Sequence, residues 1–401
     1  MRGLAAPFYL LYQTGLAPTN GTSVQLVRLL EGIEDSAVHL LWDIREAGAT
    51  SVSQSLVLDD TYEQAPAKDT DDESSINTGQ QWWSGADLNE RRLQEALQRF
   101  PSKPTRAWVF CGNERDAARA TTILQALDDP PFLLHIMDLF HNRISAAHTP
   151  RFLALIQAAN QVVCTSAAAA AEARRHRSGE THVLPCCSNF TATGRCSWDK
   201  QRFRIAVTGA LWEQSMWNES PALETFAAAW PTIKERLPGV ELHYAGAFGT
   251  HLPSSLAADV HDHGYLEPRQ CERLLHDCHL AYLAVSLNTR FGPYSVPSRL
   301  ADYLACGLPT VTCTSPGTGI FSFINQIPPA AVTNVANADE LADVITSLAN
   351  NPLQWKSASA DAAKYAEQAL HADHIRSKLL EYLDRCEVRP AGDAAAARSP
   401  T

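Results

Sequence analysis

The stretch RFGPYSVPSRLADYLACGLPTV, residues 290–311, decides the fold, because it contains a loop, a helix and a strand in close succession. Pro297 suits the first turn of a helix, where its missing N–H would be unpaired anyway, and Gly307 suits a left-handed cap that ends the helix. The apolar residues from Thr310 predict a buried strand. We therefore expect a helix from Pro297 to Cys306 that follows a glycine- and proline-containing loop.

The amino end of this predicted helix has the chemistry of an anion site. Unpaired backbone N–H groups and the helix dipole favour a phosphate or diphosphate there. Arg299 stands in the first turn and can bind phosphate with two parallel hydrogen bonds. Asp302 follows three residues later on the same face and could accept hydrogen bonds from a ribose. The alternative is an ordinary Arg–Asp pair on a helix surface, which the spacing alone would favour.

Working outward, short apolar runs alternate with longer amphipathic stretches, which is typical of an α/β protein with parallel sheets. Strands are expected near residues 7–12, 38–42, 107–111, 132–136, 161–164, 182–184, 203–208, 240–245, 280–284 and 310–313. Helices are expected near residues 23–32, 88–100, 150–159, 221–236, 268–276, 297–306, 339–350, 352–370 and 373–386.

The length of 401 residues favours two domains. We expect a Rossmann-like acceptor-side domain at 1–200 and a Rossmann-like donor domain at 201–370. A C-terminal helix at 371–386 is expected to pack back toward the first domain, and the tail at 387–401 to be disordered. The acidic, aperiodic segment 59–87 predicts a long mobile loop, whose Trp82 and Trp83 could cover a ligand or acceptor or pack beneath the loop.

Composition excludes several classes of protein. The net charge of −11 argues against a general nucleic-acid binder, although the basic strip at 174–177 could touch an anionic surface and leaves a peripheral membrane contact open. Ten cysteines without CxxC pairs predict reduced thiols rather than disulfides or zinc. Without a membrane-spanning run or a leader pattern, the chain is expected to be cytoplasmic.

The stretch 297–311 resembles the donor-site signature of retaining GT-B glycosyltransferases of group 1 (family 4-like), Pro-Ser-Lys-Leu-x-Glu-Tyr-Leu-Ala-x-Gly-x-Pro-Val. Eight positions coincide, with Arg299 in place of Lys and Asp302 in place of Glu. The resemblance implies a GT-B fold, two Rossmann-like doubly wound domains that face each other across a cleft. It also implies a glycosyltransferase (EC 2.4, hexosyltransferase-like) that uses a UDP- or GDP-sugar.

The same resemblance assigns residue roles. The expected donor and nucleotide contacts are Gly21, Gly209, Tyr265, Leu266, Arg290, Phe291, Gly292, Tyr294, Ser298, Arg299 and Asp302. The expected catalytic residues are His135 and Arg299, and the expected acceptor-side residues are Asn20, Asp138, Trp82 and Trp83. No metal and no tightly bound cofactor are implied. The acceptor stays open among glycans, lipid-linked molecules, small molecules and proteins.

The sequence departs from the family pattern at Tyr294, where many relatives carry the first of two glutamates that are separated by seven residues. The basic residues usual after the first glycine turn of the second domain are also missing. Arg299, with Arg290, is expected to supply that positive charge.

Three alternatives stay open. His135 and Asp138 could form the base of an inverting enzyme. The chain could be a nucleotide-sugar-binding homologue without activity, which the Tyr294 replacement favours. A nucleotide-sugar epimerase has a similar fold but needs more acidic residues in its sugar site.

Overall fold

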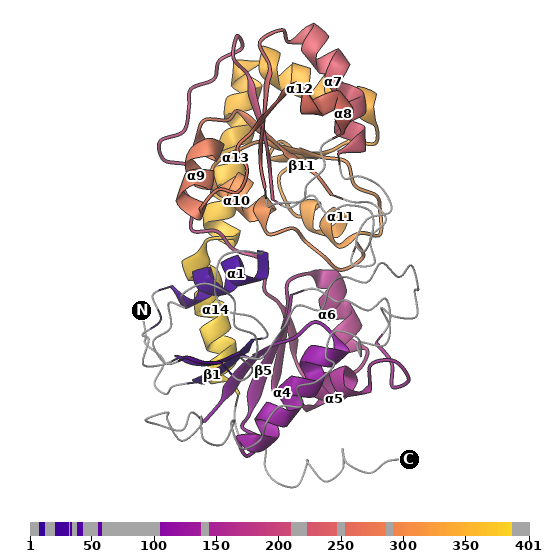
Figure 1. Ribbon diagram of the computed structural model, residues 1–401, viewed down its shortest axis with the longest axis vertical. Coiled ribbons are helices and arrows are strands. Elements are labelled where there is room, and N and C mark those ends of the chain that lie inside the picture. Colours follow the sequence, from indigo (N-terminus) through magenta and orange to yellow (C-terminus); the bar gives the residue numbers. More distant parts are fainter. Residues whose placement is uncertain are drawn as a thin grey trace. The chain divides into compact units, whose positions relative to one another are not determined.

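The computed structural model describes residues 8–12, 21–31, 33, 38–42, 55–57, 105–137, 144–209, 223–246, 253–285 and 292–386 (Figure 1). Two sheets organise these residues. One has seven strands in the order β3-β2-β1-β4-β5-β6-β7, and the other has six in the order β10-β9-β8-β11-β12-β13. Every pair of neighbouring strands is parallel, which confirms the predicted α/β class.

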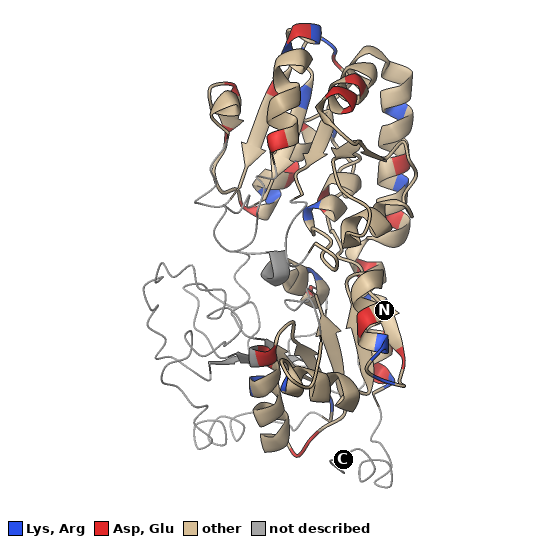
Figure 2. Cartoon of the chain, turned by 90° about the vertical axis from the view of Figure 1, so that its right-hand side faces the viewer, with Lys and Arg blue, Asp and Glu red and all other residues tan. Residues whose placement is uncertain are grey.

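The described strands carry very few charged residues, as expected for parallel strands that are covered on both faces. Figure 2 shows acidic and basic residues of both signs on the helices, whereas the strands are mostly uncharged. The exceptions among the described strands are Arg204, Glu241 and Asp262, which lie on the three neighbouring strands β8, β9 and β10.

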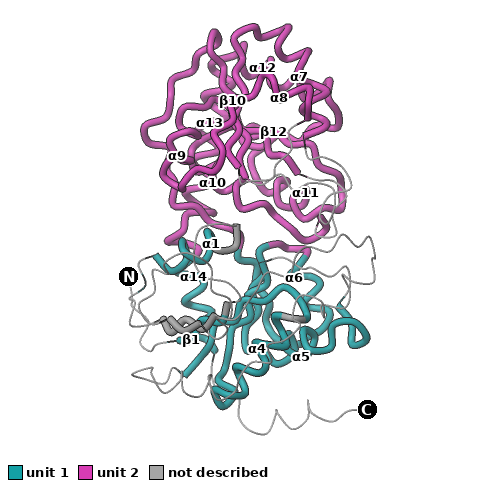
Figure 3. Tube along the Cα trace, viewed as in Figure 1, with its two compact units in different colours: residues 1–165, 169–184, 376–401 teal, residues 166–168, 185–375 magenta. Residues whose placement is uncertain are grey.

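The chain divides into two compact units (Figure 3). Unit 1 contains residues 1–165, 169–184 and 376–401, and unit 2 contains residues 166–168 and 185–375.

The seven-stranded sheet belongs to unit 1. Its strands are β1 (Phe8–Tyr12), β2 (Val38–Trp42), β3 (Ser55–Val57), β4 (Ala107–Phe110), β5 (Phe132–Ile136), β6 (Gln161–Cys164) and β7 (Thr181–Val183). The helices that precede the last strand are α1 (Gly21–Leu30), α4 (Glu114–Ala126), α5 (Pro150–Ala158) and α6 (Ala167–Arg174).

Helix α14 (Ala372–Asp384) begins in unit 2 and continues into unit 1 from Arg376. Arg376 is buried and donates from Nε to the carbonyl of Leu29 at 3.1 Å and from Nη2 to that of Arg28 at 3.0 Å. These are carbonyls of the last turn of α1, so Arg376 satisfies acceptors that a helix end leaves without an intrahelical partner. Arg106 similarly donates to the carbonyl of Leu383 at 3.1 Å.

Unit 2 contains the six-stranded sheet. Its strands are β8 (Arg204–Thr208), β9 (Glu241–Ala245), β10 (Val260–Asp262), β11 (Leu280–Leu283), β12 (Thr310–Thr312) and β13 (Val332–Asn334). Its helices are α7 (Glu224–Arg236), α8 (Ser254–Ala257), α9 (Pro268–His276), α10 (Arg299–Ala305), α11 (Gly319–Ile324), α12 (Ala338–Asn350) and α13 (Pro352–Ala369).

Helices cover both faces of this sheet, and the alternation of side chains along β8 shows how. Ile205 and Val207 point into a core that includes Phe226 and Trp230 of α7, whereas Ala206 points into a second core that includes residues of α10 such as Leu304. The small Ala206 side chain leaves room for α10 to pack beside β8. The site described below therefore rests on a buried face of the sheet.

Helix α10 ends as the sequence predicts. Gly307 has a φ of +68°, and its N–H donates to the carbonyl of Leu304 at 2.8 Å. The next N–H, of Leu308, donates to the carbonyl of Tyr303 at 2.9 Å. These two bonds form a Schellman motif, and the fully buried Leu308 then leads directly into β12.

Candidate functional site

The turn after β8 brings the backbone of unit 2 close to an arginine. Gly209 follows the strand directly and has a φ of +91°, a conformation that only glycine adopts without strain. A Cβ placed at this position would lie 2.7 Å from Nη1 of Arg299. A glycine is therefore required at this position for two reasons: the backbone conformation of the turn and the close approach of the Arg299 guanidinium.

Arg299 lies at the carboxyl ends of two neighbouring strands. Its Nη2 donates to the carbonyl of Ala284, the first residue after β11, and Nη1 faces the Gly209 turn after β8. Its Nε is buried and has no hydrogen-bond partner among the described residues. The crevice at the carboxyl ends of the strands is where ligands bind in open parallel sheets, so this cation is placed to meet an anion.

The amino end of α10 differs from the predicted one. The helix begins at Arg299, two residues later than expected, and Ser298 caps it without a side-chain hydrogen bond. The N–H groups of Leu300 and Ala301 donate to the carbonyls of Pro297 and Ser298 at 3.1 and 3.0 Å. Because these local bonds use two first-turn donors, most of the positive charge at this end comes from the Arg299 side chain.

Asp302 lies one turn further along α10 and is half-buried. Its Oδ1 accepts a 2.6 Å hydrogen bond from Oγ of Ser188, a buried residue that also accepts from the N–H of Phe190. The short bond fixes the orientation of the carboxylate. An incoming hydroxyl would meet a preoriented acceptor.

Tyr303 joins α10 to the end of β8. Its hydroxyl accepts from the N–H of Thr208 at 2.7 Å and lies 3.0 Å from the Thr208 hydroxyl. Burial raises the pKa of Tyr303 to about 12, so the phenol stays neutral. This bond holds the residue before Gly209 in place, and Tyr303 thereby supports the position of the turn against Arg299.

Two further loops of unit 2 contain predicted donor residues. Gly264 follows β10 with a φ of +61°, and its carbonyl accepts from the N–H of Gly246, the residue after β9. The next residue, Tyr265, is 39% exposed, which is unusual for a large side chain in this unit, and Leu266 is half-buried.

The loop before α10 packs against the start of α11. The carbonyl of buried Gly292 accepts from the N–H of Gly319 at 2.8 Å, and a Cβ on Gly319 would lie within 3.0 Å of the Tyr294 backbone. Tyr294 and Ser298 are half-buried. Arg290 and Phe291 lie outside the described residues.

In unit 1, His135 lies near the end of β5 and is 3% exposed. Its ring is stacked on Trp108 at a centroid distance of 6.0 Å and tilted against Phe110 at 4.5 Å. Neither ring nitrogen has a hydrogen-bond partner among the described residues. Burial lowers the pKa of His135 to about 3, so the imidazole is neutral at physiological pH.

The other predicted residues of unit 1 are less defined. Gly21 is the first residue of α1. Asn20, Asp138, Trp82 and Trp83 lie outside the described residues, as do all of 59–87 and all of 387–401.

Comparison with known proteins identifies a family that matches the part of the chain containing this site. Residues 202–351 match the family described as glycosyl transferases group 1. This part of unit 2 is similar to a group 1 glycosyltransferase domain. It contains the Gly209 turn, Arg299 and Asp302 together, and the resemblance drawn from residues 297–311 is confirmed.

Solved structures extend the likeness to the whole glycosyltransferase fold. HepE from Anabaena, solved with UDP and glucose, superposes with a TM-score of 0.66 at 14% identity over 94% of this chain and 99% of its own. Sucrose-phosphate synthase from Thermosynechococcus elongatus superposes with a TM-score of 0.63 at 12% identity, over 94% of this chain and 98% of its own. WaaG, a glycosyltransferase involved in lipopolysaccharide biosynthesis, superposes with a TM-score of 0.57 at 12% identity, over 94% of this chain and 99% of its own. These identities show the fold alone, and they confirm the GT-B prediction. No curated protein matches the chain by sequence.

The structure brings Gly209 and Arg299 together and places Asp302 on the same short helix as Arg299. Sequence reasoning did not single out Ser188, the partner of Asp302. The two residues are 114 positions apart, and a serine in an irregular segment carries no pattern that could reveal such a contact. Tyr303 was found only as part of the motif.

Proposed function

We propose that this glycosyltransferase moves a sugar from a nucleoside-diphosphate sugar to an acceptor hydroxyl with retention of the anomeric configuration. The observation that carries the proposal is the Arg299 guanidinium, held against the Gly209 turn at the carboxyl ends of β8 and β11. A diphosphate gains negative charge as the glycosidic bond breaks, and a preoriented cation stabilises that charge. HepE has been solved with UDP-glucose, so a UDP-sugar is the first donor to test.

In the proposed site, Asp302 accepts hydrogen bonds from the ribose of the donor. Ser188 supports this role because it holds the carboxylate in one orientation. Gly292 and Gly264 place backbone groups without side chains near the same sheet edge, which suits contacts to phosphate and base. The roles proposed for Gly21, Tyr265, Leu266, Tyr294 and Ser298 stay predictions.

Retention is preferred to inversion because of the state of His135. A general base works best with a pKa near the operating pH, and burial lowers the pKa of His135 to about 3. In the retaining reaction the leaving phosphate itself takes the proton of the acceptor, so no protein base is needed.

The location and the division of roles between the units also stay predictions. None of the described helices combines the length and the apolar character that a membrane-spanning helix requires. All ten cysteines are free.

The test is to incubate the full chain with radiolabelled UDP-glucose and a panel of other nucleotide sugars, and to follow release of the sugar. We expect slow donor hydrolysis, and NMR of the glycoside formed with an acceptor hydroxyl should show the anomeric configuration of the donor. Arg299→Ala should lower kcat/KM by about 10²–10³-fold, the loss typical of a removed charge-stabilising donor. Arg269→Ala, which removes an exposed arginine of α9, is the matched control.

Three results would refute the proposal. Unchanged donor affinity and turnover in Arg299→Ala would remove its basis. An epimerised donor would identify an epimerase, and binding without turnover across the panel would identify a homologue without activity.

A further inference from the structure

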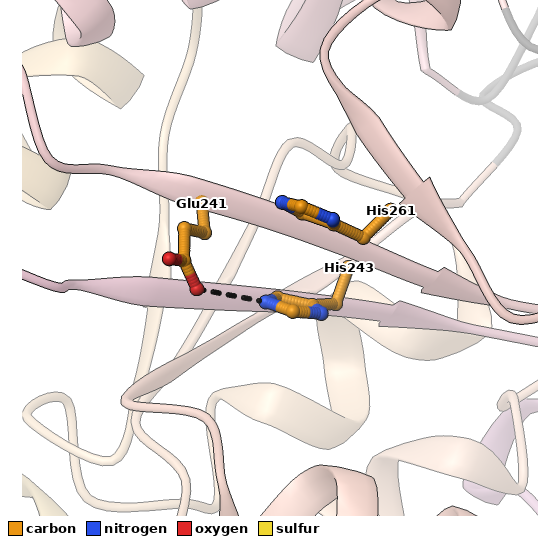
Figure 4. Close-up of side chains that lie close together, drawn as sticks. All are labelled: Glu241, His243 and His261. Atoms are coloured by element: carbon orange, nitrogen blue, oxygen red, sulfur yellow. Dashed lines mark hydrogen bonds and ion pairs between the residues drawn. The ribbon is translucent and has the colours of Figure 1, made fainter.

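A cluster of histidines lies on β9 and β10, at one edge of the sheet that the described residues of unit 2 form, together with the charged strand residue Glu241. Glu241 and His243 are two residues apart on β9 and therefore point to the same face. His261 on β10 is the register partner of His243, so the parallel pairing places the two rings side by side. Figure 4 shows these three side chains grouped over the two strands.

The spacing of this cluster is close to that of a metal site. One ligand atom from each of Glu241, His243 and His261 lies within 4.8 Å of the other two. Nε2 of His243 is 3.3 Å from Oε2 of Glu241. Two ligands of a tetrahedral ion with bonds of about 2.1 Å are about 3.4 Å apart, so this pair already has the required separation.

His261 needs a small movement to complete the set. Its ring is stacked on that of His243 with centroids 4.8 Å apart and planes 19° apart, and parallel rings cannot both direct a nitrogen at one ion. The side chain is exposed, so its ring is free of the core and can turn toward Glu241.

His263 supplies the outer contact that metal-bound histidines usually have. Its Nε2 lies 3.0 Å from Nδ1 of His243, on the side of the ring away from Glu241. When Nδ1 of His243 carries the proton and donates to His263, the lone pair of Nε2 is left for an ion.

The charges around Glu241 select the kind of ion. Arg202 and Arg204 donate from Nε to Oε1 and Oε2 at 2.9 and 3.0 Å. The carboxylate is thus largely neutralised by two cations. Calcium and magnesium, which need several anionic oxygens, are disfavoured, whereas imidazole nitrogens suit zinc, nickel and copper.

We propose that Glu241, His243 and His261 bind one divalent transition-metal ion of the zinc class, with His263 orienting His243. The ion would join the edge strand β10 to β9, immediately before Gly264 and Tyr265 in the chain. Its role is structural and independent of the proposed transferase reaction. Both could therefore hold or fail separately.

The test uses the full chain, freed of metal by a chelator and titrated with Zn²⁺ by calorimetry and with Co²⁺ by visible absorption. We expect saturable binding of one ion per chain. His243→Ala and His261→Ala should each weaken the affinity at least about tenfold, and His263→Ala by about tenfold or more. An excess of Zn²⁺ of about a hundredfold over Kd should raise the Tm of unit 2 by about 5 °C.

Two substitutions at exposed positions test the cluster without disturbing the core. Arg202, whose side chain is 61% exposed, competes for Glu241, so Arg202→Ala should tighten Zn²⁺ binding. His148→Ala removes an exposed histidine of unit 1 and should change nothing.

The proposal is overturned if the wild-type chain shows no saturable binding, or if a His243→Ala/His261→Ala chain binds Zn²⁺ as tightly as the wild type. It is also overturned if Arg202→Ala weakens the binding. That result would mean that the patch attracts anions, and titration with inorganic phosphate would then show saturation.

Discussion

Replacing Gly209 by alanine should separate backbone strain from the position of Arg299. A left-handed conformation costs a residue with a Cβ about 1–2 kcal/mol, and Gly209 has a φ of +91°. The new methyl group would also lie 2.7 Å from Nη1 of Arg299, so the guanidinium must move away from the turn. We expect a loss of about 1–2 kcal/mol in the free energy of unfolding and a loss of about tenfold to a hundredfold in kcat/KM.

Gly317 provides a matched control for this variant. Its φ is +90°, almost the same as that of Gly209, but a Cβ there would meet no heavy atom within 4 Å in the described part of the chain beyond its own neighbours. Gly317→Ala should therefore show the same loss in the free energy of unfolding, measured by urea titration, without a comparable loss of activity.

A double-mutant cycle completes the test. In the Arg299→Ala background no guanidinium is left to displace, so Gly209→Ala should add almost nothing to the loss of kcat/KM. Equal losses of activity in Gly209→Ala and Gly317→Ala, or full additivity with Arg299→Ala, would refute the idea that the turn acts by positioning this arginine.

Three further substitutions test the architecture. Arg376→Ala should lower the free energy of unfolding by about 2 kcal/mol or more in denaturant titrations, because two carbonyls at the end of α1 lose a charged donor; Arg385→Ala, just after α14 and half exposed, should have little effect. Trp355→Phe should cost about 1–2 kcal/mol in the same assay because the 2.7 Å bond from its indole N–H to the His279 carbonyl is lost, and an unchanged stability would contradict that assignment. Burial raises the pKa of Glu241, but hydrogen bonds from Arg202 and Arg204 outweigh burial and lower this pKa from 4.5 to about 2. The contribution of Glu241 to stability is therefore complete above about pH 5 and is lost as the pH falls toward 2. Thermal unfolding of Glu241→Gln should show a smaller loss of Tm over that pH range than the wild type shows. If Tm falls equally in both proteins as the pH is lowered, Glu241 does not contribute in this way.

The sequence alone was sufficient for most elements with strong periodicity. Strands β2, β5 and β6 and helix α9 have the predicted bounds, because a run of branched apolar residues or a capped amphipathic segment identifies itself locally. The glycine cap at Gly307 was equally readable, since the left-handed residue that ends a helix is chosen by local sterics.

Other elements gave no such signal. The sequence patterns gave no range for α4, α6, α8 or α11, or for the short strands β3, β10 and β13. Three-residue strands such as Val260–Asp262 are too short to show a period and exist because a neighbouring strand supplies the hydrogen bonds. The first turn of α10 was predicted too early for a related reason, since Pro297 only permits a helix to begin and the local bonds decide where it does.

The site shows the same division. The sequence identified Gly209, Arg299 and Asp302 as separate candidates from a motif and a glycine turn. Only the tertiary structure decided that the guanidinium contacts the Gly209 turn, that Ser188 orients Asp302, and that His243 and His261 lie side by side. The local sequence pattern indicates which backbone conformation each segment prefers. Contacts between residues distant in the chain arise instead from the parallel pairing of strands and the packing of α10 on the sheet.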